Sequence, residues 1–430
     1  MKQMRQMAQD KFKEIEIGKI PEGWEVKSIS EVSEIIPGGT PKTAIKEYWD
    51  GNIKWASARD VANCNSIYIH ETERKITKEG VENSAAKILP KDTIVITSRG
   101  TIGKIAILPE QMSFNQTCYG LKVIKELSSL YLYYELKNSM TLFDSVSYGT
   151  VFDTITMRTF DELKISIPPF SEQKAIAKIL SKLDAKIELN RQMNKTLEKI
   201  AQAIFKHWFI DFDFPDEEGK PYKSSGGKMV ESGTEFGRIP AGWRIGNLME
   251  IINNYDSKRI PLSSRERDKR QGSYPYYGAT SIMDYIDDYI FDGEYLLMGE
   301  DGTVVDHKGF PILQYGWGKF WVNNHAHVIK GKKGIPLEYI FLLLKHTNVF
   351  HIVTGAVQRK INQRNMNNLK VIIPPVKTLV LFNNIIPPFI KKCRINIDEK
   401  KFLSQIRDSL LPRLMSGKIR VNYDKTTPQG

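Results

Sequence analysis

The sequence predicts an α+β protein in which two α/β globular domains follow each other as a tandem repeat, each succeeded by a long helix. Three observations support this prediction: a short motif near the start of each half, a longer gapless match at the end of each half, and a helical apolar pattern after each match. Long helices of one chain that each follow a globular block most simply pack together. We therefore expect the two helices to form an antiparallel coiled coil.

The short motif is a turn with a proline followed by Gly-Trp. Gly18–Trp24 has the sequence GKIPEGW, and Gly237–Trp243 has the sequence GRIPAGW. Such a turn brings a large aromatic side chain to the edge of a domain. One copy would mean little, but two copies indicate a duplication.

The longer match is twenty-one residues without a gap. Gly149–Pro169 (GTVFDTITMRTFDELKISIPP) aligns with Gly355–Pro375 (GAVQRKINQRNMNNLKVIIPP), so that Ile155 corresponds to Ile361. This repeat is too long for a short-period solenoid, and we interpret it as a duplicated unit of one domain and one helix.

The duplication divides the chain into five parts. The blocks inside the two domains, residues 30–148 and 252–354, have diverged almost completely. The joining segment is acidic and then rich in Gly and Ser, as expected of a surface linker. The predicted parts are residues 1–170 (first domain with an N-terminal segment), 171–210 (central helix), 211–236 (linker), 237–375 (second domain) and 376–430 (C-terminal helix and tail).

The first helix follows Pro168 and Pro169, with Ser171 as N-cap and Glu172 in the first turn. At 1.5 Å per residue it would reach roughly 57 Å. A buried Asn190 would fix the register of the pair, and its repeat counterpart is Asn396; a slightly exposed middle section is the equally weighted alternative. The predicted seam is Ile176, Leu180, Leu183, Ile187, Asn190, Asn194, Leu197, Ala201, Ile204 and Trp208.

The second helix is less regular. Pro387 and Pro388 interrupt its pattern, which leaves a clean segment from about Phe389 to Met415 before the stop signal at Gly417. Its expected seam residues, taken from the repeat, are Leu403, Leu410 and Leu414.

Composition limits the class of protein. A net charge of +12 favours a polyanionic partner, although simple solubility would also explain it. The segment Lys258–Arg270 (KRIPLSSRERDKR) strengthens the nucleic-acid hypothesis, because six basic residues outnumber two acidic ones. No apolar run approaches a membrane span, no apolar signal core is present, and three scattered cysteines fit a reducing cytosol. We therefore expect a cytoplasmic protein that has no contact with membranes.

Catalytic interpretations are weak. The Ile167–Phe170 sequence IPPF resembles an amino-methyltransferase loop, but its first residue is aliphatic here and in the copies at Ile373 and Ile386, so it cannot accept a hydrogen bond from an amino group. His325 and His327 lie two apart without a third metal ligand in view. No nucleophile elbow, phosphate loop or HExxH helix is present. We expect no catalytic residue and no metal site.

Several motifs in this order resemble the specificity subunit of type I restriction–modification systems, over essentially the whole chain. The chain departs from the family at Val376–Phe389, where the second helix begins differently. The motifs are GKIPEGW, GRIPAGW, GGTPKT with EYWDG, SYPYYGA (Ser273–Ala279), IPPFSEQKAIAKIL, IAQAIFKHWFIDF (Ile200–Phe212) and LLPRLMSGKI (Leu410–Ile419).

The resemblance implies a function for the repeat. Each domain would be a target recognition domain that reads one half of a split site in double-stranded DNA, and the helices would set the spacer. Two methyltransferase subunits would dock on the helices, joined by restriction (motor–nuclease) subunits. S-adenosylmethionine, ATP and Mg²⁺ would belong to those partners, with no cofactor in this chain. The alternatives are a self-sufficient DNA methyltransferase or nuclease, and a coiled-coil adaptor without DNA.

Base recognition needs hydrogen-bonding side chains on loops, together with Lys and Arg for phosphates. For each candidate an ordinary solvated loop residue is an equally good interpretation. The candidates are Thr40, Arg59, Ser98, Arg99, Thr101, Asn115, Gln116, Tyr148 and Thr150 in the first domain, and Lys269, Arg270, Tyr277, Asp301, Lys319, Asn323, Asn324, His325 and Arg359 in the second.

Overall fold

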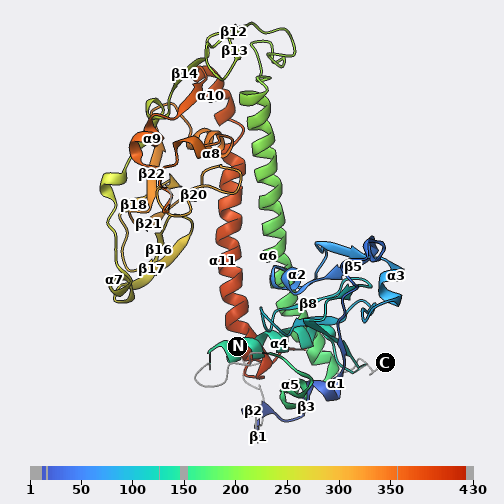
Figure 1. Cartoon of the computed structure of the whole chain (residues 1–430). Helices are drawn as coiled ribbons and strands as arrows, with labels where there is room; N and C mark the ends of the chain where they lie inside the picture. The colour runs from blue at the N-terminus through green and yellow to red at the C-terminus, as the bar shows by residue number, and fades with distance from the viewer. Residues whose placement is uncertain (1–11, 16–17, 125, 146–153, 356, 423–430) are drawn as a thin grey trace. The chain divides into compact units, whose positions relative to one another are not determined.

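The structure is a computed structural model that describes residues 12–15, 18–124, 126–145, 154–355 and 357–422 (Figure 1). It divides into two compact units. Unit 1 comprises residues 1–192 and 396–430, and unit 2 comprises residues 193–395. Each unit therefore contains one globular domain with a segment of both long helices. No helix in the described part of the chain combines the length and apolar composition that a membrane span needs.

Unit 1 is built around a four-stranded antiparallel sheet of order β4-β10-β7-β8 and a three-stranded sheet of order β6-β5-β9. Short sheets β1-β2 and β11-β3 complete it. Its strands are β1 (Phe12–Ile15), β2 (Gly18–Pro21), β3 (Glu25–Ser28), β4 (Ser33–Pro37), β5 (Trp49–Ala56), β6 (Arg74–Ile76), β7 (Ile94–Thr97), β8 (Ile105–Ile107), β9 (Ser113–Phe114), β10 (Cys118–Val123) and β11 (Lys164–Ile167). Its shorter helices are α1 (Ile29–Val32), η1 (Lys46–Tyr48), α2 (Ala58–Ala62), α3 (Lys78–Glu82), α4 (Ser129–Ser145) and α5 (Met157–Glu162).

Unit 2 contains two four-stranded sheets, of order β15-β22-β19-β20 and β17-β16-β21-β18, and the pairs β12-β13 and β14-β23. Its strands are β12 (Met229–Glu231), β13 (Arg238–Pro240), β14 (Arg244–Asn247), β15 (Ile252–Asn254), β16 (Gln271–Tyr277), β17 (Ile282–Ile286), β18 (Phe291–Asp292), β19 (Tyr295–Gly299), β20 (Leu313–Gly316), β21 (Lys319–Val322), β22 (Ala326–Gly331) and β23 (Lys370–Ile373). Its shorter helical segments are η2 (Lys206–Ile210), η3 (Leu248–Glu250), η4 (Asp256–Lys258), α7 (Ser264–Asp268), α8 (Leu337–Lys345), η5 (Phe350–Ile352), α9 (Gln363–Asn367) and α10 (Val376–Asn383).

The two domains share one topology although their sequences have diverged. The sheet β4-β10-β7-β8 corresponds to β15-β22-β19-β20, and both are antiparallel throughout. In each domain the second sheet contains one parallel pair, β5 with β9 and β16 with β21. In each domain the strand before the variable block pairs with the strand after it, β3 with β11 and β14 with β23. The duplication thus extends through the blocks in which the sequence no longer shows it.

The long helices are α6 (Phe170–Phe205) and α11 (Pro387–Met415). The first begins directly after Pro168 and Pro169 as predicted. In the second half the short helix α10 follows Pro374 and Pro375, and α11 begins at Pro387, where the sequence predicts an interruption. Within unit 1, Asp184 binds Arg407 and Asn190 binds Glu399. As the residue number increases along α6, the residue number of its partner on α11 therefore decreases. Within unit 2, Asn194 Nδ2 donates to Cys393 O at 3.0 Å. In each unit the helix segments are therefore paired antiparallel, and the predicted fold class is confirmed.

The residues of the predicted seam are largely buried or half-buried. Ile176, Leu180, Ala201 and Trp208 on α6 and η2, and Leu414 on α11, are buried, and the remaining apolar seam residues are half-buried. Asn190 is 1% exposed, so the alternative of an exposed middle section is wrong at this position. Its amide donates to Glu399 Oε2 at 2.9 Å, one helical turn from the equally buried Asn396.

The start of the linker differs from the expected surface segment. Phe212 and Phe214 are buried, and the ring of Phe214 stacks on Trp243 with 5.0 Å between centroids. These aromatics hold the second Gly-Trp motif in the core of unit 2. In unit 1 the corresponding Trp24 instead donates from Nε1 to Glu172 at 3.2 Å. The repeated motif is therefore a structural anchor whose partners differ between the units.

Candidate nucleic-acid interface

Hydrogen bonds join three segments of unit 1: the end of β5, the end of β7, and the turn between β9 and β10. The backbone N–H of Asn115 donates to Ala56 O at 3.0 Å. Ser98 donates to Thr117 O from its backbone N–H at 2.8 Å and from its hydroxyl at 2.9 Å. Thr117 Oγ1 in turn donates to Asn115 Oδ1 at 2.9 Å. We call this region, Ala56–Arg59, Ser98–Thr101 and Asn115–Thr117, the loop end of unit 1.

The backbone hydrogen bonds that join these three segments are called the frame below. The other described candidates of the first domain lie beside this frame. Thr40 donates from its hydroxyl to Gln116 Oε1. Arg59 is exposed on α2, directly after β5, while Arg99 and Thr101 are exposed on the loop after β7. The structure thus brings together polar and basic residues that are distant in sequence. Tyr148 and Thr150 lie outside the described residues.

Unit 2 repeats the same frame. The backbone N–H of Asn323 donates to Tyr277 O at 3.1 Å, as that of Asn115 does to Ala56 O. The N–H of Glu300 donates to His325 O at 2.8 Å, as that of Ser98 does to Thr117 O. We call the corresponding region, Glu300–Thr303 with Asn323–His325, the loop end of unit 2.

The gapless sequence match fixes the correspondence of the two frames. Ile361 N–H donates to Glu300 O at 2.8 Å, and Ile155 N–H donates to Ser98 O at 3.0 Å. These two isoleucines are the counterparts in the repeat. Position 98 therefore corresponds to 300, 99 to 301, and 117 to 325.

Three sequence candidates are buried because they form the frame. Ser98 and Asn323 are each 3% exposed, and Tyr277 is 7% exposed in contact with Phe320. They position the loops and do not present their side chains to solvent, so the interpretation of these residues as exposed loop candidates was wrong. Asn324 and Arg359 are exposed, and Asp301 and His325 are half-buried.

Three other candidates of the second domain are not at the loop end. Lys269 and Arg270 precede β16, and Lys319 begins β21, at the opposite ends of these strands from Tyr277 and Asn323. Arg270 binds Asp287 at 2.9 Å and lies 5.0 Å from the centre of the Trp321 ring. The structure therefore separates them from Asp301 and His325.

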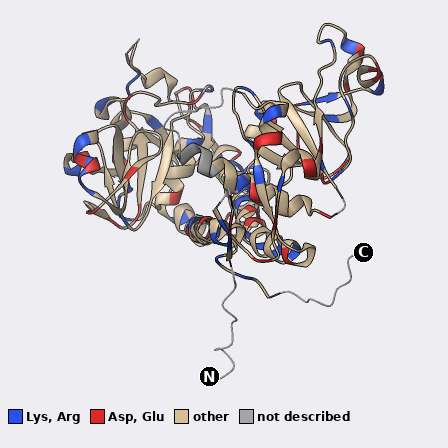
Figure 2. Ribbon diagram, turned by 90° about the horizontal axis from the view of Figure 1, so that it is seen from below, with Lys and Arg blue, Asp and Glu red and all other residues tan. Residues whose placement is uncertain are grey.

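Three of the six cations in the basic segment Lys258–Arg270 pair with carboxylates inside unit 2, which weakens the segment as support for a nucleic-acid partner. Arg259 is 12% exposed and donates to Glu300 Oε2 at 2.6 Å. Arg267 pairs with Asp284 at 3.3 Å, and Arg270 pairs with Asp287 as described above. Lysines, arginines and acidic residues are interspersed on both units (Figure 2).

Arg259 is a positioning residue that sequence reasoning missed. Its guanidinium donates to the carbonyl of Ala326 at 2.7 Å and to that of Asn324 at 3.4 Å, besides its bond to Glu300. It therefore fixes both sides of the turn at the loop end of unit 2. No local sequence pattern indicates this role, because Arg259 and its partner Glu300 are 41 residues apart.

His327 completes a buried ionic network with Arg259. Its Nδ1 lies 2.6 Å from Asp256 Oδ2, and its Nε2 donates to Ile361 O at 2.7 Å. Burial alone would raise the pKa of Asp256, but hydrogen bonds from His327, Val328 and Asn254 outweigh it and lower the pKa.

Potential metal ligands converge here, but cations already occupy the neighbourhood. Ligand atoms of Asp256, Glu300 and His327 lie within 4.8 Å of one another. Arg259 and Lys360 both bind Glu300, and both nitrogens of His327 face acceptors. This arrangement fits an ion-pair network better than a metal site. The sequence pair His325 and His327 does not converge on one point, because His325 binds Asp301 instead.

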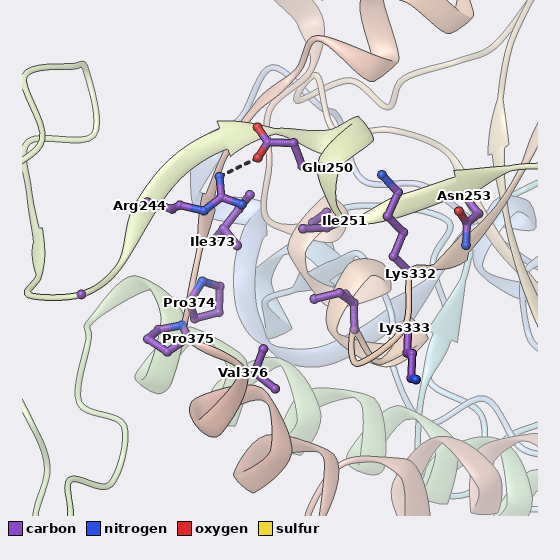
Figure 3. A pocket seen from close by; sticks show the side chains of 12 residues that line it. Arg244, Glu250, Ile251, Asn253, Lys332, Lys333, Ile373, Pro374, Pro375 and Val376 are labelled. Atoms are coloured by element: carbon purple, nitrogen blue, oxygen red, sulfur yellow. Dashed lines mark hydrogen bonds and ion pairs between the residues drawn. The ribbon is translucent and has the colours of Figure 1, made fainter.

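A separate pocket of about 640 Å³ lies in unit 2 at Lys332 and Lys333, which follow the other end of β22 from His325. Figure 3 shows Arg244 and Glu250 joined beside this pocket, at 2.6 Å. Lys332 Nζ also donates to Met249 O at 2.6 Å. Arg244 and Lys332 are thus engaged in holding the unit together, and the pocket does not coincide with the loop end.

Comparison with known proteins identifies the class that this repeated architecture represents. The chain belongs to the family of the type I restriction modification DNA specificity domain, whose model matches residues 21–199 and again 240–402. The two matches contain the two domains with their loop ends. The resemblance recognised in the sequence is therefore confirmed.

Relatives match over nearly the full length. The type I restriction enzyme MjaIX specificity subunit of Methanocaldococcus jannaschii is 32% identical, over 95% of this chain and 96% of its own. The EcoprrI specificity subunit of Escherichia coli is 25% identical over 86% of this chain and 89% of its own. The crystal structure of the S subunit from M. genitalium superposes with a TM-score of 0.60 at 17% identity, covering 91% of this chain and 96% of that one, which supports the fold.

Proposed function

We propose that this chain is the non-catalytic, DNA-binding specificity subunit of a type I restriction–modification complex, and that each loop end reads one half of a split DNA site. The observation that supports this most strongly is the repeated frame with different side chains. The same backbone hydrogen bonds present Arg99 and Thr117 in unit 1 but Asp301 and His325 in unit 2. Two similar supports with unlike side chains suit a bipartite site with unlike halves.

The chemistry of the loop ends matches base recognition. Specific readout in the major groove depends on donors and acceptors held at fixed positions, while cations at the rim bind phosphates. Gln116 and Asn324 are amides of the kind that pair with adenine, and Arg59, Arg99 and Arg359 are exposed cations suited to guanine or phosphate. These exposed residues remain the candidates for direct contact.

The helices are proposed to dock two methyltransferase subunits, and through them the restriction subunits. Apolar side chains that face solvent on helices often mark protein interfaces. In unit 1, Leu189 on α6 is 50% exposed and Phe402 on α11 is 62% exposed. In unit 2, Val376 and Val380 on α10 are 60% and 53% exposed. S-adenosylmethionine, ATP and Mg²⁺ would be bound by those partners, and the complex would work in the cytoplasm.

Domain exchange tests the proposal. Residues 1–170 are replaced by those of another family member, and the complex with its methyltransferase subunits is used to methylate a genome. Mapping of the methylated adenines is expected to show one half-site changed and the other retained. The matched exchange of residues 237–375 should change the other half-site. If the first exchange alters both half-sites, the modular function is refuted.

The alternatives are separated by assays of the purified chain alone. A self-sufficient enzyme would methylate DNA with S-adenosylmethionine, or cleave it with Mg²⁺, and we expect neither. A coiled-coil adaptor would show no DNA affinity that falls steeply with salt, whereas a DNA-binding subunit should show it.

A further inference from the structure

His325 projects from a turn whose backbone is held on several sides. Its N–H donates to Asn323 Oδ1 at 2.8 Å, and its carbonyl accepts from the N–H of Glu300 at 2.8 Å. Arg259 binds the carbonyls of the residues on either side, Asn324 and Ala326. The ring is therefore mounted on a rigid support at the loop end of unit 2.

The ring itself has one occupied and one available nitrogen. Nδ1 lies 2.5 Å from Asp301 Oδ1, and because a carboxylate only accepts hydrogen bonds, Nδ1 bears the proton. The His325 side chain is 44% exposed, and that of Asp301 is 17% exposed. Within the described residues, no hydrogen bond occupies Nε2, in contrast to His327, which is enclosed and bonded at both nitrogens.

We propose that His325 is a specificity-determining residue of the second half-site, with Asp301 as its positioning residue. This inference rests on the proposed function. The contact with Asp301 selects the tautomer with its proton on Nδ1. In this tautomer Nε2 is an acceptor, so it suits the exocyclic amino group of adenine or cytosine in the major groove. The carboxylate of Asp301 beside it disfavours the acceptor atoms of guanine and thymine at the same place.

The corresponding positions of unit 1 agree with a role in discrimination. Thr117 occupies the place of His325, and its hydroxyl is bonded to Asn115 Oδ1. Arg99 occupies the place of Asp301 and is exposed. The two positions thus differ in charge and hydrogen-bonding character between the units, while the backbone bonds around them are the same. Such positions change which base is read without changing the frame.

The experiment uses the complete chain in complex with its methyltransferase subunits. A DNA library with each position of both half-sites randomised in turn is methylated, and base preference is obtained by sequencing. The variants are His325→Ala, Asp301→Ala and Asp301→Asn. The control is His207→Ala, since His207 is an exposed histidine on η2, outside the variable block.

His325→Ala and Asp301→Ala are expected to weaken the preference at one position of the second half-site by about tenfold or more. Asp301→Asn still accepts the Nδ1 proton and should retain most of the preference. The first half-site and the control should be unchanged, which also shows that the variants are folded. The inference is overturned if His325→Ala leaves every position of the second half-site as in the wild type, or weakens both half-sites equally. If the wild-type complex prefers no split site at all, the proposed function itself is wrong.

Discussion

Replacing Glu135 by Gln is expected to remove a pH-dependent loss of stability from unit 1. Glu135, on α4, is 5% exposed, and its Oε1 accepts from the N–H and hydroxyl of Ser166, each at 3.4 Å. Its Oε2 has no hydrogen-bond partner among the residues that the structure describes. Burial raises the pKa of Glu135 from 4.5 to about 8, against the opposing effect of the Ser166 bonds. The folded protein therefore holds this carboxyl protonated at neutral pH.

The size of the effect follows from linkage. Between pH 4.5 and about 8 the unfolded chain releases a proton that the folded chain keeps, so the wild-type free energy of unfolding falls as pH rises. Each pH unit of this window is worth about 1.4 kcal/mol, which gives a difference on the order of 4 kcal/mol between Gln and Glu at pH 8. Any packing cost of the Gln amide is a constant offset, so the slope against pH is diagnostic.

The assay is amide hydrogen exchange by mass spectrometry of the full chain at a series of pH values, with peptides from α4 and β11 reporting the stability of unit 1. Other titrating groups cancel in the difference between Glu135→Gln and the wild type. Glu79→Gln, at an exposed position of α3, is the control for loss of a surface carboxylate. A difference that stays constant from pH 5 to pH 8 would refute the argument.

Three further outcomes are expected. Arg407→Met removes the arginine that pairs with Asp184, whose side chain is 11% exposed, and leaves the longer contact to Lys137 at 3.9 Å, so it should lower the free energy of unfolding by about 3 kcal/mol. Adding Asp184→Asn should recover part of this loss, and thermal unfolding of the single variant, the double variant and the wild type checks both expectations. Matched insertions of two helical turns after Asn190 in α6 and Asn396 in α11 add about 10 Å, and should lengthen the spacer by about three base pairs with both half-sites retained in methylation mapping. Arg259→Ala should lower recognition of the second half-site and not of the first, because it frees the turn that Arg259 holds, and randomised-site methylation measures this.

The helices and the duplication could be predicted because they depend on local signals. The Pro-Pro pairs before Phe170 and at Pro387 fix where the helices begin, and Gly417, with φ at 68°, ends the second one. The spacing of apolar residues along residues 171–210 identifies the buried face of α6. These features require no knowledge of distant partners, so sequence alone was sufficient.

The loop ends could be predicted only in part, because distant contacts decide which polar residues are exposed. Asn323 and Arg359 are both polar residues, so residue type alone does not tell which of them is exposed. In the structure Asn323 is 3% exposed and supports the frame, while Arg359 is exposed. Arg259 belongs to the basic segment that favoured a nucleic-acid partner, but its guanidinium binds Glu300, which lies 41 residues further along the chain. Local composition contains no information about either pairing.

The shared frame also explains why the variable blocks keep one topology after their sequences have diverged. Its defining bonds, such as Ser98 N–H to Thr117 O and Glu300 N–H to His325 O, join backbone atoms, which every residue except proline provides as donors. Selection on the frame therefore places little constraint on the side chains that it presents. Position 99 is Arg and the corresponding position 301 is Asp, and both units keep these bonds. Under the proposed function, such positions are the ones through which a family member would acquire a new half-site while keeping its fold.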